Sequence, residues 1–106
     1  MSAMIHCKDN KIVVQGSITI DNVVTMTQQG IALFKDNRLS VLDLSKITDV
    51  DSAVISMLLE WLREARKIDL RLQFANITDS LASLIQLYGI AELIPTDDLS
   101  YNESTQ

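Results

Sequence analysis

Side chains that could do chemistry gather at one point of the chain, between a β-rich apolar run and the most strongly helical segment. The carboxylates Asp43, Asp49 and Asp51 occur there together with the hydroxyl of Ser52. Open α/β sheets place their working residues where a strand runs into a helix. The chemistry available at such a point is hydrogen bonding, proton transfer or acceptance of a phosphate group.

The rest of the sequence gives catalysis little support. A Ser–His or Cys–His nucleophile would have to use His6, the only histidine, which lies beside Cys7 in an expected N-terminal strand. We expect a structural role for His6, and a role within the strand end for Asp43, which has no second titrating group to work with. No ligand spacing predicts a metal, and the three scattered glycines exclude a phosphate-binding loop. The sequence therefore predicts a protein that is not an enzyme and has no cofactor or metal.

Length and charge favour one small domain with a protein partner. The chain has 106 residues, of which 47% are hydrophobic, so it can bury one compact core. Lys and Arg total 9 against 14 Asp and Glu, a net charge of −5, which argues against binding nucleic acid or an anionic membrane surface. The excess negative charge all follows Arg71. We expect a domain over residues 1–95 and an acidic, flexible tail over 96–106.

The sequence also predicts a cytoplasmic protein. Its single cysteine, Cys7, excludes an internal disulfide and fits a reducing compartment. Residues 1–15 lack the uninterrupted apolar stretch of a signal peptide. The most apolar segment, 53–62, is too short to span a bilayer. Any membrane association would be indirect.

Periodicity and turn residues predict the order β-β-α-β-α-β-α. The expected ranges are 5–7, 11–15, 22–37, 39–44, 52–67, 70–74 and 79–88, with residues 90–94 packing or pairing before Pro95. The turn-forming pair Asp9-Asn10 is expected to join the first two strands in a hairpin. Gly16 is expected to end the second strand, residues 17–20 to extend that region, and Asp21 to cap the first helix. A polar loop should separate the strand 39–44 from the helix that begins at Ser52. Thr78 or Asp79 should cap the last helix, which ends at Gly89.

The sequence allows two interpretations of the role of Ser52. Its hydroxyl can cap the helix by accepting a bond from a first-turn amide, contributing on the order of 1 kcal/mol. Alternatively, the unpaired amides of a helix start can receive a phosphate or an acceptor group of a partner. Asp49 and Asp51 would repel an added phosphate, so the local charge favours protein contact.

The helix over residues 52–67 has a broad apolar arc. Trp61 lies at the centre of its apolar stripe and is expected in the core. Packing on a sheet needs a stripe of only about 100°. The excess width could be covered by neighbouring helices, or one margin could be left for a partner. For that margin we favour Ala53 and Met57, which adjoin Ser52 and Ser56.

Two runs carry a resemblance to a known family. VLDLSKITDVDSAVISMLLEWLREARK, residues 41–67, resembles the signature of the STAS domain, and NITDSLASLIQLYGIAELIP, residues 76–95, resembles that family's terminal strand-to-helix segment. STAS domains occur in anti-sigma-factor antagonists and in a small cytoplasmic subunit of the bacterial Mla phospholipid-transport ABC system. The resemblance implies a single STAS domain, with a mixed sheet and helices packed mainly on one face.

Within that family the sequence is more similar to the Mla subunit. There a small hydroxyl residue follows an Asp, as Ser52 follows Asp51, and the subunit binds and supports the transporter's ATPase. In the antagonists the Asp is followed by two Ser/Thr-like positions and a Gly, and the second hydroxyl is phosphorylated by the anti-sigma-factor kinase. Ala53 and Val54 occupy the last two of those positions here, so Ser52 is the remaining candidate for phosphorylation.

The resemblance thus implies a partner-binding site at the helix start, for the ATPase subunit of an ABC transporter. The alternative is an anti-sigma-factor antagonist whose partner is a kinase. The expected partner-binding residues are Asp49, Asp51, Ser52, Ala53, Ser56 and Met57.

Overall fold

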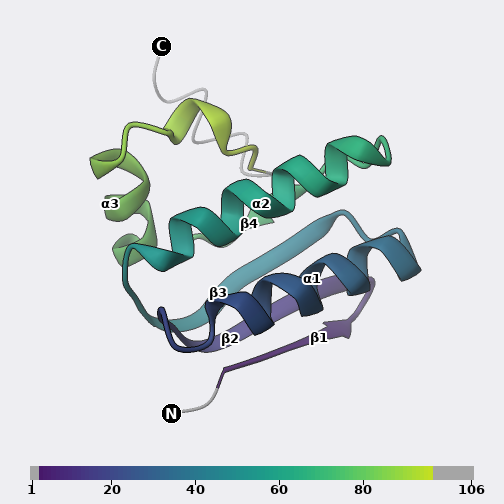
Figure 1. Ribbon diagram of the computed structural model, residues 1–106, viewed down its shortest axis with the longest axis horizontal. Helices are drawn as coiled ribbons and strands as arrows, with labels where there is room; N and C mark the ends of the chain where they lie inside the picture. The colour runs from purple at the N-terminus through teal and green to yellow at the C-terminus, as the bar shows by residue number, and fades with distance from the viewer. Residues whose placement is uncertain (1–2, 97–106) are drawn as a thin grey trace.

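The computed structural model describes residues 3–96, and the rest of the expected acidic tail, 97–106, lies outside the described residues. The elements are β1 (Met4–Lys8), β2 (Lys11–Ile18), α1 (Val23–Asn37), β3 (Val41–Val50), α2 (Ala53–Lys67), β4 (Gln73–Ala75), α3 (Asp79–Leu87) and the short 3₁₀ helix η1 (Ala91–Leu93). Figure 1 follows this order by colour. The predicted order β-β-α-β-α-β-α is confirmed.

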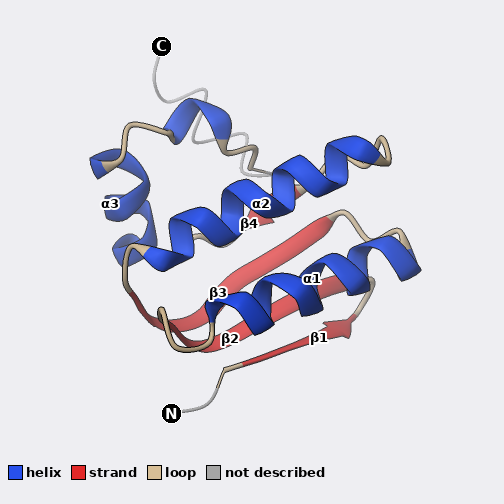
Figure 2. Ribbon diagram, in the orientation of Figure 1, coloured by secondary structure: helices blue, strands red, loops and turns tan. Residues whose placement is uncertain are grey.

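Four strands form one mixed sheet in the order β1-β2-β3-β4. β1 is antiparallel to β2, whereas β2, β3 and β4 are parallel to one another. α1 and α2 lie side by side against the sheet, as Figure 2 shows. Because α1 connects β2 to β3 and α2 connects β3 to β4, both helices begin at the carboxyl edge of the parallel strands. That edge is where the candidate site lies.

The N-terminal hairpin forms as predicted. Asp9 and Asn10 both adopt positive φ angles, 54° and 64°, which the tight turns of hairpins require. Gly16, however, does not end β2. It has a φ of 97° and sits where the β2–β3 register shifts, so the strand continues through it to Ile18.

The predicted polar loop after residue 44 is wrong. β3 continues to Val50 and pairs with β2 beyond the end of β4, with Gln15 opposite Lys46 and Ile18 opposite Val50. Backbone hydrogen bonds to β2 alone hold this end of β3 in a strand, although most of its side chains are polar and exposed to water. β4 is shorter than predicted because Leu70 still closes the end of α2, through a bond from its amide to the carbonyl of Ala65 (2.9 Å).

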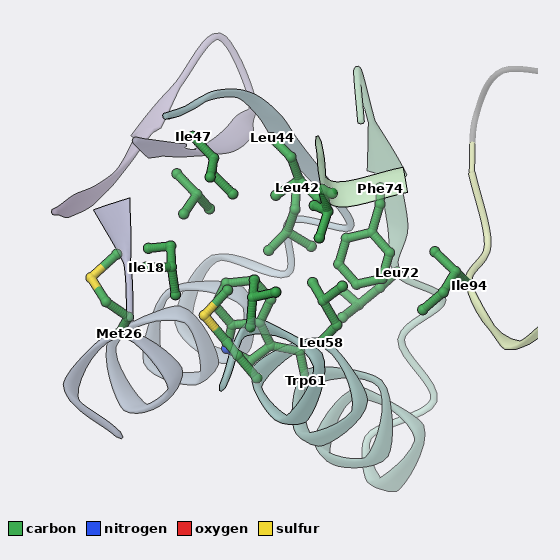
Figure 3. Packing of buried hydrophobic residues seen from close by; sticks show 14 of the residues in the cluster. Ile18, Met26, Leu42, Leu44, Ile47, Leu58, Trp61, Leu72, Phe74 and Ile94 are labelled. Carbon is green, nitrogen blue, oxygen red and sulfur yellow. The ribbon is translucent and has the colours of Figure 1, made fainter. Parts of the chain in front are cut away.

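The core lies between the sheet and the two long helices. Trp61 is its largest fully buried side chain, as predicted, and packs among residues of both layers (Figure 3). Its Nε1 donates to the carbonyl of Thr27 in α1 at 2.9 Å. A Cβ at Gly30 would lie 2.5 Å from the indole ring, so only a glycine lets α1 approach α2 this closely.

The starts of α1 and α3 are held differently. At α1 the N-cap residue is Asn22, so the prediction of Asp21 is wrong. The Asn22 side chain folds back instead, accepting from the amide of Thr19 and donating to the carbonyl of Ser17. At α3 the hydroxyl of Thr78 accepts from the amide of Leu81, so one of the two predicted caps is confirmed.

The end of α3 leads into the last described segment. Gly89 follows the helix with a φ of 69°, the left-handed conformation that ends many helices, which confirms the predicted helix end at Gly89. Residues 90–94 pack: they contain η1, and Ile94 is buried. Thr96, the first residue of the expected tail, pairs in parallel with Phe74 of β4.

Candidate functional site

A shallow surface depression lies at the start of α2, beside the turn that connects β2 to α1. In Figure 1 these two segments meet at the left of the molecule. The depression is lined by Ile20, Val23, Asp51, Ser52, Ala53 and Ser56. Four of these six were among the partner-binding residues expected from the sequence, so the fold brings most of the predicted set together.

Asp51 connects the two segments. One of its carboxylate oxygens accepts from the amide of Ala53 (2.9 Å) in the first turn of α2. The other accepts from the amide of Ile20 (3.3 Å) in the turn before α1. The bond between Ile20 and Asp51 thus joins residues 31 apart in sequence.

Ser52 is exposed at the N-cap position, but its hydroxyl does not cap the helix. The expected cap is wrong because Ser52 already has helical torsions, φ −62° and ψ −16°, whereas a capping hydroxyl needs an extended backbone. The expectation of unpaired amides fails too. Ala53 bonds to the Asp51 carboxylate, and Val54 and Ile55 bond to the carbonyls of Asp51 and Ser52 at 3.0 and 3.1 Å.

Asp49 and Ser56 are exposed close to this start. Asp49 accepts from the hydroxyl of Ser17 (3.2 Å), which also lies 3.3 Å from the hydroxyl of Thr48. Ser56 donates to the carbonyl of Ala53 (3.0 Å) within its own helix. Ser56 lines the depression together with Asp51 and Ser52, which makes its α2 side polar, whereas Asp49 is not among the lining residues.

Met57 corrects the predicted contact set. It is fully buried, so the expectation that it lies on a contact surface is wrong. Ile55 is also buried, and Leu59 and Leu62 pack against the core, so the excess apolar width of α2 is largely covered within the domain. Ala53 remains partly exposed.

Ile20 is the residue that sequence reasoning missed. It is 76% exposed, and Val24, in the first turn of α1, is 66% exposed. The sequence assigns residues 17–20 only to an extension of the second strand's region, and Val24 fits the helical spacing of the apolar residues in the first helix. A large apolar residue directly before an Asp-Asn turn was the available signal.

Asp43 lies elsewhere, in a network that holds strands together. It accepts from the amide of Ser45 (2.9 Å) and from Asn76 (3.3 Å), and forms an ion pair with Lys11 (3.2 Å). Burial raises the pKa of Asp43, but the bonds from Ser45, Asn76 and Lys11 outweigh burial and lower the pKa from 3.8 to about 2. The carboxylate therefore stays ionised and acts within the fold, as expected from the sequence.

Residues 3–96 contain neither a metal-ligating cluster nor a membrane-spanning helix. That part of the chain has no group of three or more His, Cys, Asp or Glu side chains placed to hold a metal. It also contains no helix long and apolar enough to cross a bilayer. His6 and Cys7 lie in β1, as predicted, an edge strand of the sheet that contributes no residue to the depression.

Comparison with known proteins places this fold. A family model described as the MlaB STAS domain matches residues 3–95. A search of curated protein sequences finds no match. A chain of the Acinetobacter MlaFEDB complex in an ATP-bound conformation is 22% identical, with a TM-score of 0.74 over 88% of this chain and 99% of that chain.

Two solved structures of the antagonist type are also similar. A putative anti-sigma factor antagonist from Thermotoga maritima is 13% identical, with a TM-score of 0.71 over 97% of this chain and 92% of that one. The antagonist SpoIIAA in its unphosphorylated form is 12% identical, with a TM-score of 0.67 over 98% and 96% of the two chains. At these identities the likeness establishes the fold.

Proposed function

We propose that this chain, which belongs to the STAS domain family, is a cytoplasmic docking subunit that binds and supports the ATPase of a phospholipid-transporting ABC complex. It makes and breaks no covalent bond, and it reaches the membrane through its partner. The domain that docks is residues 1–95.

The observation that carries the proposal is the exposed hydroxyl of Ser52, which its own helix does not use. Asp49, Asp51, Ala53 and Ser56 surround it as the polar and small residues of the docking surface. Two further facts support the choice of partner: the family model is of the MlaB type, and a chain of the MlaFEDB complex has the same fold.

A second candidate is an anti-sigma-factor antagonist that is controlled by phosphorylation of Ser52. Exposure of Ser52 and the likeness to SpoIIAA favour it. Against it, the amide of Ala53 is already bonded to the Asp51 carboxylate, and that negative charge would lie beside an added phosphate. We therefore rank ATPase docking first.

A charge-bearing bulky side chain at position 52 tests the proposal. Ser52→Arg should weaken binding of the Mla-type ATPase subunit from the same organism at least tenfold, because the new side chain occupies the depression. The matched control is Ser83→Arg, which changes an exposed serine of α3 that does not line the depression. Calorimetric titration gives the affinities, and thermal melts by circular dichroism should agree within about 2 °C for both variants, as expected for surface substitutions.

Equal affinities for the two variants would contradict ATPase docking at this surface. Phosphate mapping separates the candidates further. Stoichiometric phosphate on Ser52 after incubation with an extract of the same organism would favour the antagonist, whereas unmodified Ser52 favours the docking subunit.

A further inference from the structure

We propose that Asp51 is a positioning residue that fixes Ile20 beside Ser52, and that Ile20 is the apolar contact through which the docking surface takes its partner. The partner chemistry that fits is a protein segment with an exposed apolar side chain flanked by Lys or Arg. This inference rests on the proposed function and names what that function leaves open, namely which side chain makes the contact and what holds it.

Both carboxylate oxygens of Asp51 are occupied within the domain. They accept from the amides of Ala53 (2.9 Å) and Ile20 (3.3 Å). The backbone of Asp51 adds two more links, since its amide donates to the carbonyl of Ile18 (3.4 Å) and its carbonyl accepts from Val54 (3.0 Å). Asp51 therefore joins the end of β2, the turn and the start of α2, which fits a residue that organises the surface better than one that faces a partner.

The turn that carries Ile20 is closed mainly on itself. Thr19 accepts from the amides of Asn22 (3.1 Å) and Val23 (2.9 Å) through its carbonyl, and from Asp21 (3.3 Å) through its hydroxyl. These bonds shape the turn but do not tie it to α2. The bond from Ile20 to Asp51 is the link that crosses the depression, so it decides where the exposed side chain sits.

Ile20 is an unusual residue to leave in water. Its side chain is large and apolar, 76% of the residue is exposed, and exposed Val24 lies one helical turn away in sequence. Single apolar residues on a surface need no explanation. Here, however, Ile20 and Val23 form one wall of a depression whose other wall is the α2 start, so an inserted apolar side chain would be shielded from water on both sides.

The charges around the depression define the flanks of the partner. Residues 17–24 and 47–57 contain Asp21, Asp49 and Asp51 and no Lys or Arg. Complementary positive charge on the partner would guide association and suppress wrong partners. The partner segment is therefore apolar with basic flanks, and a segment with neutral or acidic flanks would not fit.

The two bonds from the Asp51 carboxylate to the amides of Ala53 and Ile20, here called the clamp, can be tested without any partner. Amide hydrogen exchange of the isolated chain should be at least tenfold faster at Ile20 in Asp51→Ala, with the amide of buried Phe34 unchanged. Asp51→Asn is the second variant, because its single acceptor oxygen can keep the bond to Ala53 while the bond to Ile20 is lost. Unchanged exchange at Ile20 in both variants would overturn the clamp.

A double-mutant cycle tests the contact and the route by which Asp51 acts. With the Mla-type ATPase subunit as the probe, Ile20→Ala and Asp51→Asn should each weaken binding about tenfold. The double variant should be within about threefold of Ile20→Ala alone, since Asp51 acts through Ile20. If the double variant instead lost affinity by the product of the two single fold-changes, Asp51 would not act through Ile20 and would contact the partner directly. If Ile20→Ala bound with full affinity, Ile20 would not be the apolar contact.

Two further outcomes complete the test. The affinity of the unchanged chain should fall as salt rises, because exposed charge pairs are screened, and an affinity independent of salt would overturn the basic flank. If the unchanged chain does not bind the ATPase subunit at all, the proposed function fails and the contact role of Ile20 fails with it. The exchange measurement then still decides the clamp.

Discussion

The helices α2 and α3 both follow a parallel strand and both begin at a hydroxyl residue, yet the two hydroxyls do different things. Thr78 has an extended backbone, with φ −72° and ψ 161°, and its hydroxyl accepts from the amide of Leu81 at 3.3 Å. Ser52 has helical torsions and makes no such bond. The difference is that the residue before Ser52 is an aspartate, whose carboxylate takes the first amide of α2.

The surface at a helix start stays available when the hydroxyl at the N-cap is not bonded to its own helix. Where the N-cap hydroxyl bonds to its own helix, the start is closed and the residue contributes to stability. At α2 the Asp51 carboxylate accepts from the first amide, and the carbonyls of Asp51 and Ser52 accept from the next two, so the Ser52 hydroxyl is left to meet solvent or a partner. The same residue type thus has a structural role at α3 and an interaction role, as we propose, at α2.

The sharpest contrast lies within α2 itself, between its exposed start and Met57. Met57→Ala should lower the free energy of unfolding by about 2–5 kcal/mol, because a fully buried side chain is lost and a cavity remains. Urea denaturation measures the loss. Exposed Ser56→Ala is the control and should cost less than about 0.5 kcal/mol. A small effect for Met57→Ala would mean that the contact surface extends one turn further along α2 than the structure indicates.

The stability of the fold in acid sets the pH range in which variants at the two helix starts can be compared. The pKa of Asp43 is lowered in the folded chain to about 2, from 3.8. A lowered carboxyl pKa stabilises the fold above the ordinary value, and that contribution is lost as pH falls from about 4 towards 2. At neutral pH it amounts to about 2 kcal/mol. Asp43→Asn should therefore be less stable than the unchanged chain at pH 7 and should lose less stability on acidification, as urea titrations at both pH values would record.

Equal losses on acidification in the two chains would contradict the ionised network around Asp43. The variant keeps the shape of the side chain, so its packing between the strands serves as its own control. Binding measurements on Ser52 then belong above about pH 4, where this contribution is present.

The smallest expected effects on stability are those of removing the two hydroxyls at the starts of α2 and α3. Thr78→Ala should cost about 1 kcal/mol, because it removes a cap bond, whereas Ser52→Ala should cost less than about 0.5 kcal/mol. Thermal or urea unfolding of the two variants side by side measures both. If Ser52→Ala were as costly as Thr78→Ala, the Ser52 hydroxyl would be capping its helix in solution and would not be free.

Sequence patterns predicted what local chemistry decides. The turn pair Asp9-Asn10, the apolar periodicity around Trp61 and the cap at Thr78 or Asp79 each act within a few residues. The turn and the burial of Trp61 are confirmed, and of the two cap candidates the structure has Thr78. The run over residues 41–67 also indicated the STAS family, which the family model then matched. Element order and family were therefore within reach of the sequence.

The errors arise where distant segments or backbone torsions decide. Pairing with β2 extends β3 through its polar end, and a register shift carries β2 through Gly16. The helical torsions of Ser52 prevent its hydroxyl from capping α2, and packing in the core buries Met57. Ile20 could not be assigned to the site, because its place depends on a bond to Asp51, 31 residues away in sequence.

The most direct test of the central claim is a hydrogen-exchange footprint of the chain on the Mla-type ATPase subunit. Docking at the α2 start predicts that protection on binding is gained within residues 19–24 and 51–56 and is unchanged in β1 (Met4–Lys8) at the far edge of the sheet. Protection gained in β1 or in α3, with residues 19–24 and 51–56 unchanged, would contradict the account.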